Sequence, residues 1–195
     1  MNLTSLNRTL PQVEYIEPIY INDYERAWNA REDKTKTLST TYLGVEKKDG
    51  SKINCIIFEV PEEELERMDQ REFLYTRELV SIEKLEILEE TNLNITANDK
   101  IWIYKTNTPK SPGPQQPLIQ SYIDVCLSGC MDLEIKFKTQ NFALEFISLT
   151  KNWSENWVND RIYPRAPHIH QPYAYKIDAM LSSALSSLYE RITIE

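Results

Sequence analysis

The segment Ile53–Glu72, INCIIFEVPEEELERMDQRE, carries the clearest structural signals in the chain. Its first part, Ile53–Val60, is a run of apolar and β-branched residues that predicts a buried strand. Pro61 suits the first position of a helix, and the glutamates that follow it complement the positive end of the helix dipole. Apolar residues at helical spacing then continue to a helix end expected close to Glu72. The segment therefore predicts a central strand followed at once by a helix.

The residues before this segment predict further strands. Ile19–Asn29 and Thr40–Val45 are rich in β-branched and aromatic residues. Lys47–Ser51 contains an Asp-Gly pair, which indicates a tight hairpin, so the strands on its two sides are expected to pair with each other. A short helix is expected over Thr4–Leu10, ending at Pro11.

The second half of the chain changes character from strand to helix. Strands are predicted over Tyr75–Leu88 and Asp99–Tyr104, with a turn rich in asparagine between them. Helices are predicted over Leu118–Leu127, Lys138–Thr150 and Tyr175–Glu190 from the spacing of apolar residues. Because strands gather early and helices late, the pattern predicts an α+β protein and not an alternating α/β protein.

Composition excludes several classes of protein. A chain of 195 residues with 41% hydrophobic and 27% charged residues is typical of one globular domain. The net charge is −8 and no run of lysine or arginine is long enough to follow a phosphate backbone, so no nucleic-acid partner is expected. No window approaches the ~18 apolar residues that a membrane span needs, and no amino-terminal stretch has the basic start and apolar core of a signal peptide, which favours a soluble cytoplasmic protein without a membrane partner. Nucleotide-binding glycine motifs and the Gly-x-Ser-x-Gly elbow are also missing from the sequence.

Cysteine and histidine offer little chemistry. Cys55, Cys126 and Cys130 are expected to be free thiols buried in a reducing compartment. His168 and His170 form a His-x-His pair between prolines, but the sequence supplies no cluster of cysteine or carboxylate ligands to complete a metal site. No metal site is therefore predicted.

Several short motifs become informative through their order along the chain. They are Trp28-Asn29-x-Arg31, Thr41-Tyr42-Leu43-Gly44-Val45, Phe58–Leu65, Met68-Asp69-Gln70-Arg71-Glu72 with Tyr75-x-Arg77, and Tyr122–Gly129. Together they resemble the γ-glutamylcyclotransferase-like superfamily, which includes the AIG2-like proteins. The resemblance covers residues 1–165 and implies a small mixed β-barrel with flanking helices. Residues 166–195 are expected to form a C-terminal helical extension packed on the same domain, held by the aromatic and charged cluster around Trp153, Trp157 and Arg161.

The resemblance also implies an activity and a site. Relatives carry a catalytic glutamate at the end of a Leu-Asp-x-x-Glu segment, which Met68–Glu72 matches with a Leu-to-Met change of nearly neutral volume. Glu72 is thus expected to be the general acid/base in the release of 5-oxoproline from a γ-glutamyl amino acid or amine, by attack of the α-amine on the γ-carbonyl. Tyr75 and Tyr122 resemble the family's substrate-lining tyrosines. The implied partner is a small-molecule γ-glutamyl substrate, and no cofactor is implied.

Other interpretations stay open at these residues. Taken alone, Glu72 fits a surface carboxylate paired with Arg71 or Arg77, and the tyrosines fit half-buried packing residues. Arg31 and Arg161 are candidates for binding a substrate carboxylate, because a guanidinium presents a fork that matches one.

One hallmark of the family is missing, the Tyr-Gly-Ser loop whose backbone N–H groups face the substrate. Met1–Leu10 lines up with the segment directly after that loop in relatives, so Met1 is expected to be an internal start, with the natural frame extending upstream. Losing such donors typically costs about a hundredfold to a thousandfold in rate, which predicts an inactive or weakly active chain. The lost strand would leave an edge that a partner chain could cover, which allows a homo-oligomer. A non-catalytic binding or regulatory protein that keeps the fold is the alternative function.

Overall fold

The computed structural model describes residues 13, 16–31, 39–165 and 173–194. The strands are β1 (Glu17–Ala30), β2 (Tyr42–Ile57), β3 (Tyr75–Val80), β4 (Leu85–Ile87), β5 (Ile101–Thr106), β6 (Leu118–Ile119), β7 (Thr150–Lys151), β8 (Trp157–Asn159) and β9 (Thr193–Ile194). The helices are α2 (Leu65–Arg71), α3 (Gln120–Phe137), α4 (Phe142–Leu149), α5 (Ala174–Ala184) and α6 (Ser186–Tyr189), with short 3-10 turns η1 (Glu62–Glu64) and η2 (Ile82–Lys84). The helix expected over Thr4–Leu10 and the His168/His170 pair lie outside the described residues.

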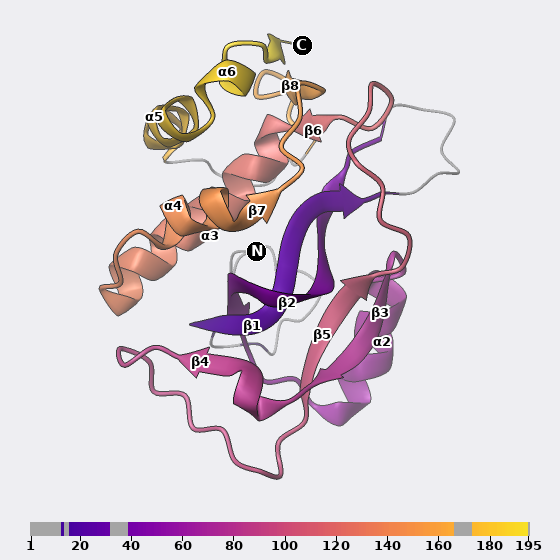
Figure 1. Ribbon diagram of the computed structural model, residues 1–195, viewed down its shortest axis with the longest axis vertical. Helices are drawn as coiled ribbons and strands as arrows, with labels where there is room; N and C mark the ends of the chain where they lie inside the picture. Colours follow the sequence, from indigo (N-terminus) through magenta and orange to yellow (C-terminus); the bar gives the residue numbers. More distant parts are fainter. Residues whose placement is uncertain (1–12, 14–15, 32–38, 166–172, 195) are drawn as a thin grey trace.

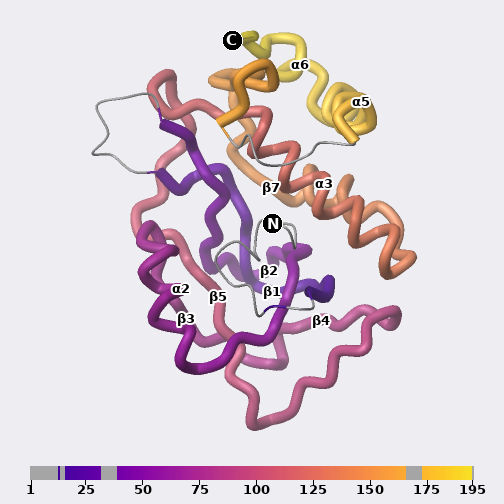
Figure 2. Tube along the Cα trace, turned by 180° about the vertical axis from the view of Figure 1, so that it is seen from behind, coloured from indigo at the N-terminus to yellow at the C-terminus, as the bar shows by residue number. Residues whose placement is uncertain are grey.

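Strands β1 to β5 lie toward one end of the molecule, whereas α5 and α6 lie at the other end together with the short strands β6 and β8 (Figure 1). β1 lies between β2 and β4 and also pairs with β7, whereas β3 and β5 form a separate antiparallel ribbon and β6, β8 and β9 a short parallel sheet. Seen from behind, α3 and α4 lie over one side of the β1–β2 pair and α2 lies beside β3 (Figure 2). The predicted α+β class is confirmed, because strands fill the first half and longer helices the second.

The hairpin predicted at Lys47–Ser51 is wrong. β2 runs through this segment as one strand, and both of its halves pair antiparallel with β1: Glu17–Asn22 with Lys52–Ile57, and Tyr24–Ala30 with Tyr42–Lys47. The Asp-Gly pair forms a bulge, in which Gly50 has a φ of 74° and its N–H donates to the Asp23 carboxylate at 3.0 Å. Asp23 also has a positive φ, of 64°, so the irregularity is matched on both strands. An Asp-Gly pair can form either a hairpin turn or a bulge. Here it forms a bulge, because β1 is long enough to pair with the residues of β2 on both sides of it.

Arg26 ties the two halves of this bent pair together. It is 5% exposed on β1 and donates to the carbonyl and side-chain oxygens of Asn54 at 2.5 and 2.8 Å. It also donates to Thr150 Oγ1 at 2.8 Å and to the Phe146 carbonyl at 3.0 Å, and its guanidinium lies 4.0 Å from the centre of the Phe146 ring. Burial lowers the pKa of Arg26 to about 10. Neutral oxygens from β2, α4 and β7 therefore meet at one buried cation.

The strand predicted over Tyr75–Leu88 is interrupted. β3 ends at the buried Val80, the η2 turn follows, and β4 then pairs with β1 instead of with β5. The interruption lets the chain pass from the β3–β5 ribbon to the sheet that contains β1. The alternation of apolar and polar residues in the sequence did not predict this break.

Gly44 of β2 lies close against side chains of β1 and β5. A Cβ atom at Gly44 would lie 2.0 Å from both Asn29 Oδ1 and Thr106 Oγ1, and these two atoms are hydrogen-bonded at 3.2 Å. Gly44→Ala is therefore expected to destabilise the fold by about 1–3 kcal/mol, the usual cost of overpacking a buried site. Urea unfolding measures the loss, with Gly113→Ala as the control, because a Cβ there would meet only Arg31 Nη1 at 3.4 Å. Equal stability of the two variants would contradict this close approach.

The helices differ from the predicted ones at their ends. α3 continues ten residues past the predicted end at Leu127, because Ser128, Gly129 and Cys130 are buried in the core and tertiary packing supports the helix there. α4 begins at Phe142 and not at Lys138, since Lys138 and Asn141 adopt left-handed backbone angles that break the helix. The last predicted helix is divided into α5 and α6 at Leu185, whose φ is −133°.

The C-terminal segment joins the same core as the rest of the chain. Ile177 and Leu181 of α5 are fully buried among residues of α3, α4 and β8, and β9 pairs in parallel with β8. The α5 and β9 residues thus pack with the rest of the described chain, and the division at residue 165 stays a prediction.

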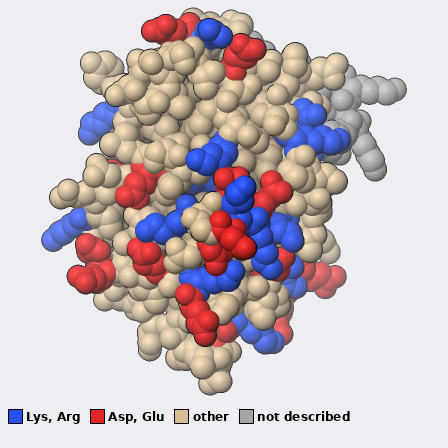
Figure 3. Space-filling view, in the orientation of Figure 1, with Lys and Arg blue, Asp and Glu red and all other residues tan. Residues whose placement is uncertain are grey.

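The surface shows charges of both signs. On the face in Figure 3, lysine and arginine are interspersed with aspartate and glutamate, mainly over the half that holds the larger sheet and the β3–β5 ribbon. Within the described residues, none of the helices is long and apolar enough to cross a membrane.

Candidate active site

Glu72 is held at the point where α2 stops. Its N–H donates to the Met68 carbonyl at 2.8 Å, and its own carbonyl accepts from the Tyr75 N–H at 2.8 Å. Its backbone has left the helical region, with φ −91° and ψ 39°. The helix end predicted at this residue is confirmed, and the side chain is presented from a backbone fixed on both sides.

The Glu72 carboxylate lies in a partly desolvated place. Its side chain is 19% exposed, and Oε1 lies 3.3 Å from Arg71 Nε. Burial raises the pKa of Glu72 above its ordinary value, and the nearby Arg71 opposes part of that rise. A carboxyl with a raised pKa is better suited to exchange protons near neutral pH than a solvated one.

Tyr75 and Tyr122 lie in the electrostatic field of Glu72. Burial and then the Glu72 charge raise the pKa of Tyr75, whose hydroxyl donates to the Leu43 carbonyl at 2.7 Å. Burial also raises the pKa of Tyr122, with Cys126, Tyr75 and Glu72 adding to the shift. The structure thus brings together three residues singled out from the sequence: one from the end of α2, one from β3 and one from α3.

Tyr42 belongs to the same group but was not singled out from the sequence. Its ring meets that of Tyr122 edge to face at 5.3 Å, and Tyr122 in turn meets the buried Trp28 at 6.0 Å. Tyr42 is 38% exposed, so it is the solvent-facing member of the aromatic group. Its place directly before Leu43-Gly44, in one of the quoted motifs, was the signal that could have marked it.

Asp69 explains how α2 is fixed relative to the β3–β5 ribbon. Its carboxylate accepts hydrogen bonds from Arg77 Nη2 at 3.1 Å and from the Tyr104 hydroxyl at 2.8 Å, and its Oδ1 also forms an ion pair with Arg77 Nε at 3.0 Å. Such a bidentate pair defines orientation as well as distance. Arg77 therefore binds Asp69 and not Glu72, and it helps to place Glu72 by holding the helix that ends there.

A groove of about 340 Å³ lies beside the contact between Asp69 and Arg77. It is lined by Asp69, Tyr75, Thr76, Arg77 and Trp102. The Arg77 guanidinium lies 4.7 Å from the centre of the Trp102 ring, which forms one wall. Because Tyr75 belongs both to the groove and to the surroundings of Glu72, the groove borders the candidate site.

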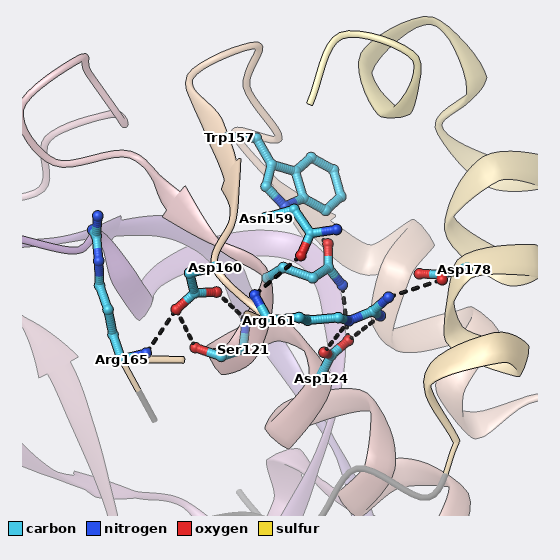
Figure 4. Close-up of polar contacts among 9 residues, drawn as sticks. Ser121, Asp124, Trp157, Asn159, Asp160, Arg161, Arg165 and Asp178 are labelled. Carbon is cyan, nitrogen blue, oxygen red and sulfur yellow. Dashed lines mark hydrogen bonds and ion pairs between the residues drawn. The ribbon is translucent and has the colours of Figure 1, made fainter. Parts of the chain in front are cut away.

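Arg31 and Arg161 are held in other places. Arg31 follows β1 and donates from Nη1 to the Ser111 carbonyl at 3.0 Å, in the proline-rich loop. Arg161 donates from Nε and Nη2 to Asp124 at 2.7 and 2.8 Å and from Nη1 to Asp178 at 2.8 Å (Figure 4). Burial by itself lowers the pKa of Arg161, but the hydrogen bonds to Asp124 and Asp178 outweigh it and leave the pKa raised. Its guanidinium thus links the start of α3 to α5.

A third carboxylate, that of Asp160, caps the start of α3 although it lies far from this helix in the sequence. Asp160 is fully buried and accepts from the Ser121 N–H at 2.7 Å, the Ser121 hydroxyl at 2.6 Å and the Arg165 N–H at 2.8 Å (Figure 4). The residue before α3, Ile119, has no side chain that could cap the helix. Asp160 therefore satisfies an N–H of the first turn, which also carries Tyr122.

The thiols offer no nucleophile. Cys55, Cys126 and Cys130 are free, and burial raises the pKa of Cys130 to about 12 and that of Cys126 above its ordinary value. A thiol of this kind stays protonated at neutral pH and reacts poorly. Among the described residues, no group of histidine, cysteine and carboxylate side chains could hold a metal ion.

Comparison with known proteins places these features in a family. The family model described as gamma-glutamyl cyclotransferase, AIG2-like, matches residues 5–123, a range that includes Glu72, Tyr75 and Tyr122. The chain belongs to this family. The resemblance drawn from the order of short motifs is confirmed.

Two solved structures share the fold of this AIG2-like chain. One is an uncharacterized human protein, loc79017, with a TM-score of 0.54 and 11% identity over 76% of this chain and 82% of that one. The other is named gamma-glutamyl cyclotransferase, with a TM-score of 0.54 and 10% identity over 78% of this chain and 85% of that one. No curated protein sequence matches the chain. The likeness confirms the γ-glutamylcyclotransferase-like α+β fold predicted from the sequence.

Proposed function

We propose that this protein is a γ-glutamyl cyclotransferase that releases 5-oxoproline from a γ-glutamyl amino acid or amine, with Glu72 as general acid/base. The observation that carries the proposal is the position of Glu72: a partly desolvated carboxylate at the end of α2, matching the family's catalytic glutamate and grouped with Tyr75 and Tyr122. Membership of the family supports this activity in general terms.

The reaction needs no water and no second substrate. The α-nitrogen of the γ-glutamyl group forms a bond to its own γ-carbonyl carbon, and the bond from that carbon to the leaving nitrogen breaks. The α-ammonium loses two protons on becoming the lactam N–H, and Glu72 takes each in turn and delivers it to the leaving nitrogen, which departs as an ammonium, so the carboxylate is regenerated in each turnover. Since the attack is intramolecular, holding the substrate curled supplies much of the rate.

In our proposal, the tyrosines near Glu72 hold the substrate in this curled conformation. Tyr75 and Tyr122 line the Glu72 carboxylate in our proposal, and the tie from the Tyr75 hydroxyl to the Leu43 carbonyl limits its movement. The amine portion of the substrate extends past Tyr75 into the groove beside Trp102, which is open enough to accept a side chain. Arg31 and Arg161 are not assigned to the substrate, because Arg161 already meets Asp124 and Asp178, and Arg31 holds the proline-rich loop.

A stoichiometric assay tests the proposal. The purified chain is incubated with a panel of γ-glutamyl amino acids and γ-glutamyl amines, and 5-oxoproline and the free amine are quantified together. Cyclotransfer predicts equal amounts of both products and no glutamate, whereas hydrolysis would give glutamate. A version extended upstream by a strand and a Tyr-Gly-Ser turn is assayed in parallel. Absence of 5-oxoproline from both well-folded proteins would overturn the proposal.

A further inference from the structure

Arg71 and Glu72 are chain neighbours whose charged groups meet, which a continuous helix does not allow. Side chains one residue apart point in different directions from a helix. Here α2 ends at Arg71, and the backbone of Glu72 turns to φ −91° and ψ 39°. The change of direction brings Glu72 Oε1 to 3.3 Å from Arg71 Nε, with the two side chains 19% and 26% exposed. The helix end thus creates a half-buried ion pair at the candidate base.

We propose that Arg71 is a positioning residue for cyclotransfer, which keeps the Glu72 carboxylate ionised and fixed in direction until substrate arrives. This inference rests on the proposed function and adds to it a residue with a distinct task. Glu72 can accept the ammonium proton only as a carboxylate, and a carboxylate in a desolvated site tends to be protonated. The guanidinium of Arg71 counteracts that tendency through its contact from Nε to Glu72 Oε1.

Among the described groups around Glu72, Arg71 is the one whose charge favours the ionised carboxylate. Tyr75 from β3, Tyr104 from β5 and Tyr122 from α3 all feel the charge of Glu72, and burial raises the pKa of each, so these phenols are neutral at neutral pH. The neighbouring carboxylate of Asp69 is matched by Arg77. In the described part of the chain, Arg71 is the charged group that lowers the pKa of Glu72.

The sign of the effect follows from these contacts. An opposite charge within about 4–6 Å lowers a carboxyl pKa by about 1–3 units, and partial exposure places this pair at the low end of that range. Replacing Arg71 by a neutral residue should raise the pKa of Glu72 by about 1 unit. The acidic limb of kcat/KM should then move up by the same amount, so that activity below the pKa falls about tenfold while the plateau at higher pH changes little.

The experiment measures the Glu72 pKa directly and the pH profile separately. Carboxyl-carbon NMR titration is run without substrate on the native chain, Arg71→Gln, Arg71→Met and Arg71→Lys, and kcat/KM is recorded against pH for each. Arg67→Gln is the matched control, because Arg67 lies one turn earlier in α2 and pairs with Glu64 at 3.6 Å on the surface. We expect the Gln and Met variants to shift both titrations upward, the Lys variant to restore most of the native value, and the control to leave both unchanged.

Each outcome decides a different point. An unshifted Glu72 pKa in a folded neutral variant overturns the proposal for Arg71. If neither neutral variant folds, the Arg71 Nε–H signal of the native chain must still change as Glu72 titrates, and an Nε–H signal indifferent to that titration also overturns it. A shifted pKa in a chain that releases no 5-oxoproline would leave the ion pair in place and count against cyclotransfer alone.

Discussion

Glu72→Gln is expected to lower 5-oxoproline release by about 10²- to 10⁴-fold, the usual contribution of a positioned general acid/base. Glutamine keeps the size of the side chain but cannot take the ammonium proton or return it to the leaving nitrogen. Rates measured at saturating and at low substrate should both fall, because the lost interaction belongs to the transition state.

The same variant should not lose stability, which separates a chemical effect from a folding defect. Burial raises the folded-state pKa of Glu72, so ionisation at neutral pH opposes folding, and a neutral side chain removes that penalty. Urea unfolding at pH 7 should therefore show Glu72→Gln to be at least as stable as the native chain. Glu66→Gln, an exposed position of the same helix, serves as the control and should keep full activity. Full activity in Glu72→Gln would exclude Glu72 as the acid/base.

Arg161→Met is expected to cost about 3–5 kcal/mol of unfolding free energy, because it leaves the Asp124 carboxylate buried without its partner. Asp124 is fully buried, and Arg161 meets it through two hydrogen bonds while also contacting Asp178. Adding Asp124→Leu to this variant should recover much of the loss, since an apolar pair of similar volume carries no desolvation penalty.

A surface pair provides the comparison for this prediction. Arg191 lies 3.3 Å from Glu155, with side chains 65% and 66% exposed, so Arg191→Met should cost less than about 1 kcal/mol. Urea unfolding followed by tryptophan fluorescence measures all three variants. A loss from Arg161→Met no larger than that from Arg191→Met would mean that the network of Figure 4 does not hold α3 to the C-terminal helices.

Local signals along Ile53–Glu72 were sufficient to predict the end of α2. The proline, the glutamates and the apolar spacing all act within one helix, and the helix does end at Arg71 with Glu72 as its cap. The matching motif then placed a candidate base at this residue. The sequence alone also allowed Glu72 to be a carboxylate paired with Arg71, and the structure contains this pair. The ion pair and the proposed acid/base role therefore concern the same side chain.

Features that depend on distant residues could not be predicted in this way. The bulge at Gly50 needs Asp23 on the opposite strand, and the length of α3 depends on packing around Gly129 and Cys130. Tyr42 becomes part of the site only because β2 runs past α3. The sequence marked Arg161 as a candidate for a substrate carboxylate, and the contacts that its guanidinium makes with Asp124 and Asp178 come from distant segments that no local signal reveals.

The buried Arg26 has a consequence for how the larger sheet opens. A bulge divides a ladder of hydrogen bonds, and the segments on its two sides could fray independently. Arg26 lies in one segment, yet it holds Asn54, which belongs to the other. Separating either segment would leave the buried Arg26 guanidinium without its hydrogen bonds to Asn54. Amide hydrogens on both sides of Asp23 should therefore exchange with solvent at similar, slow rates, as one cooperative unit.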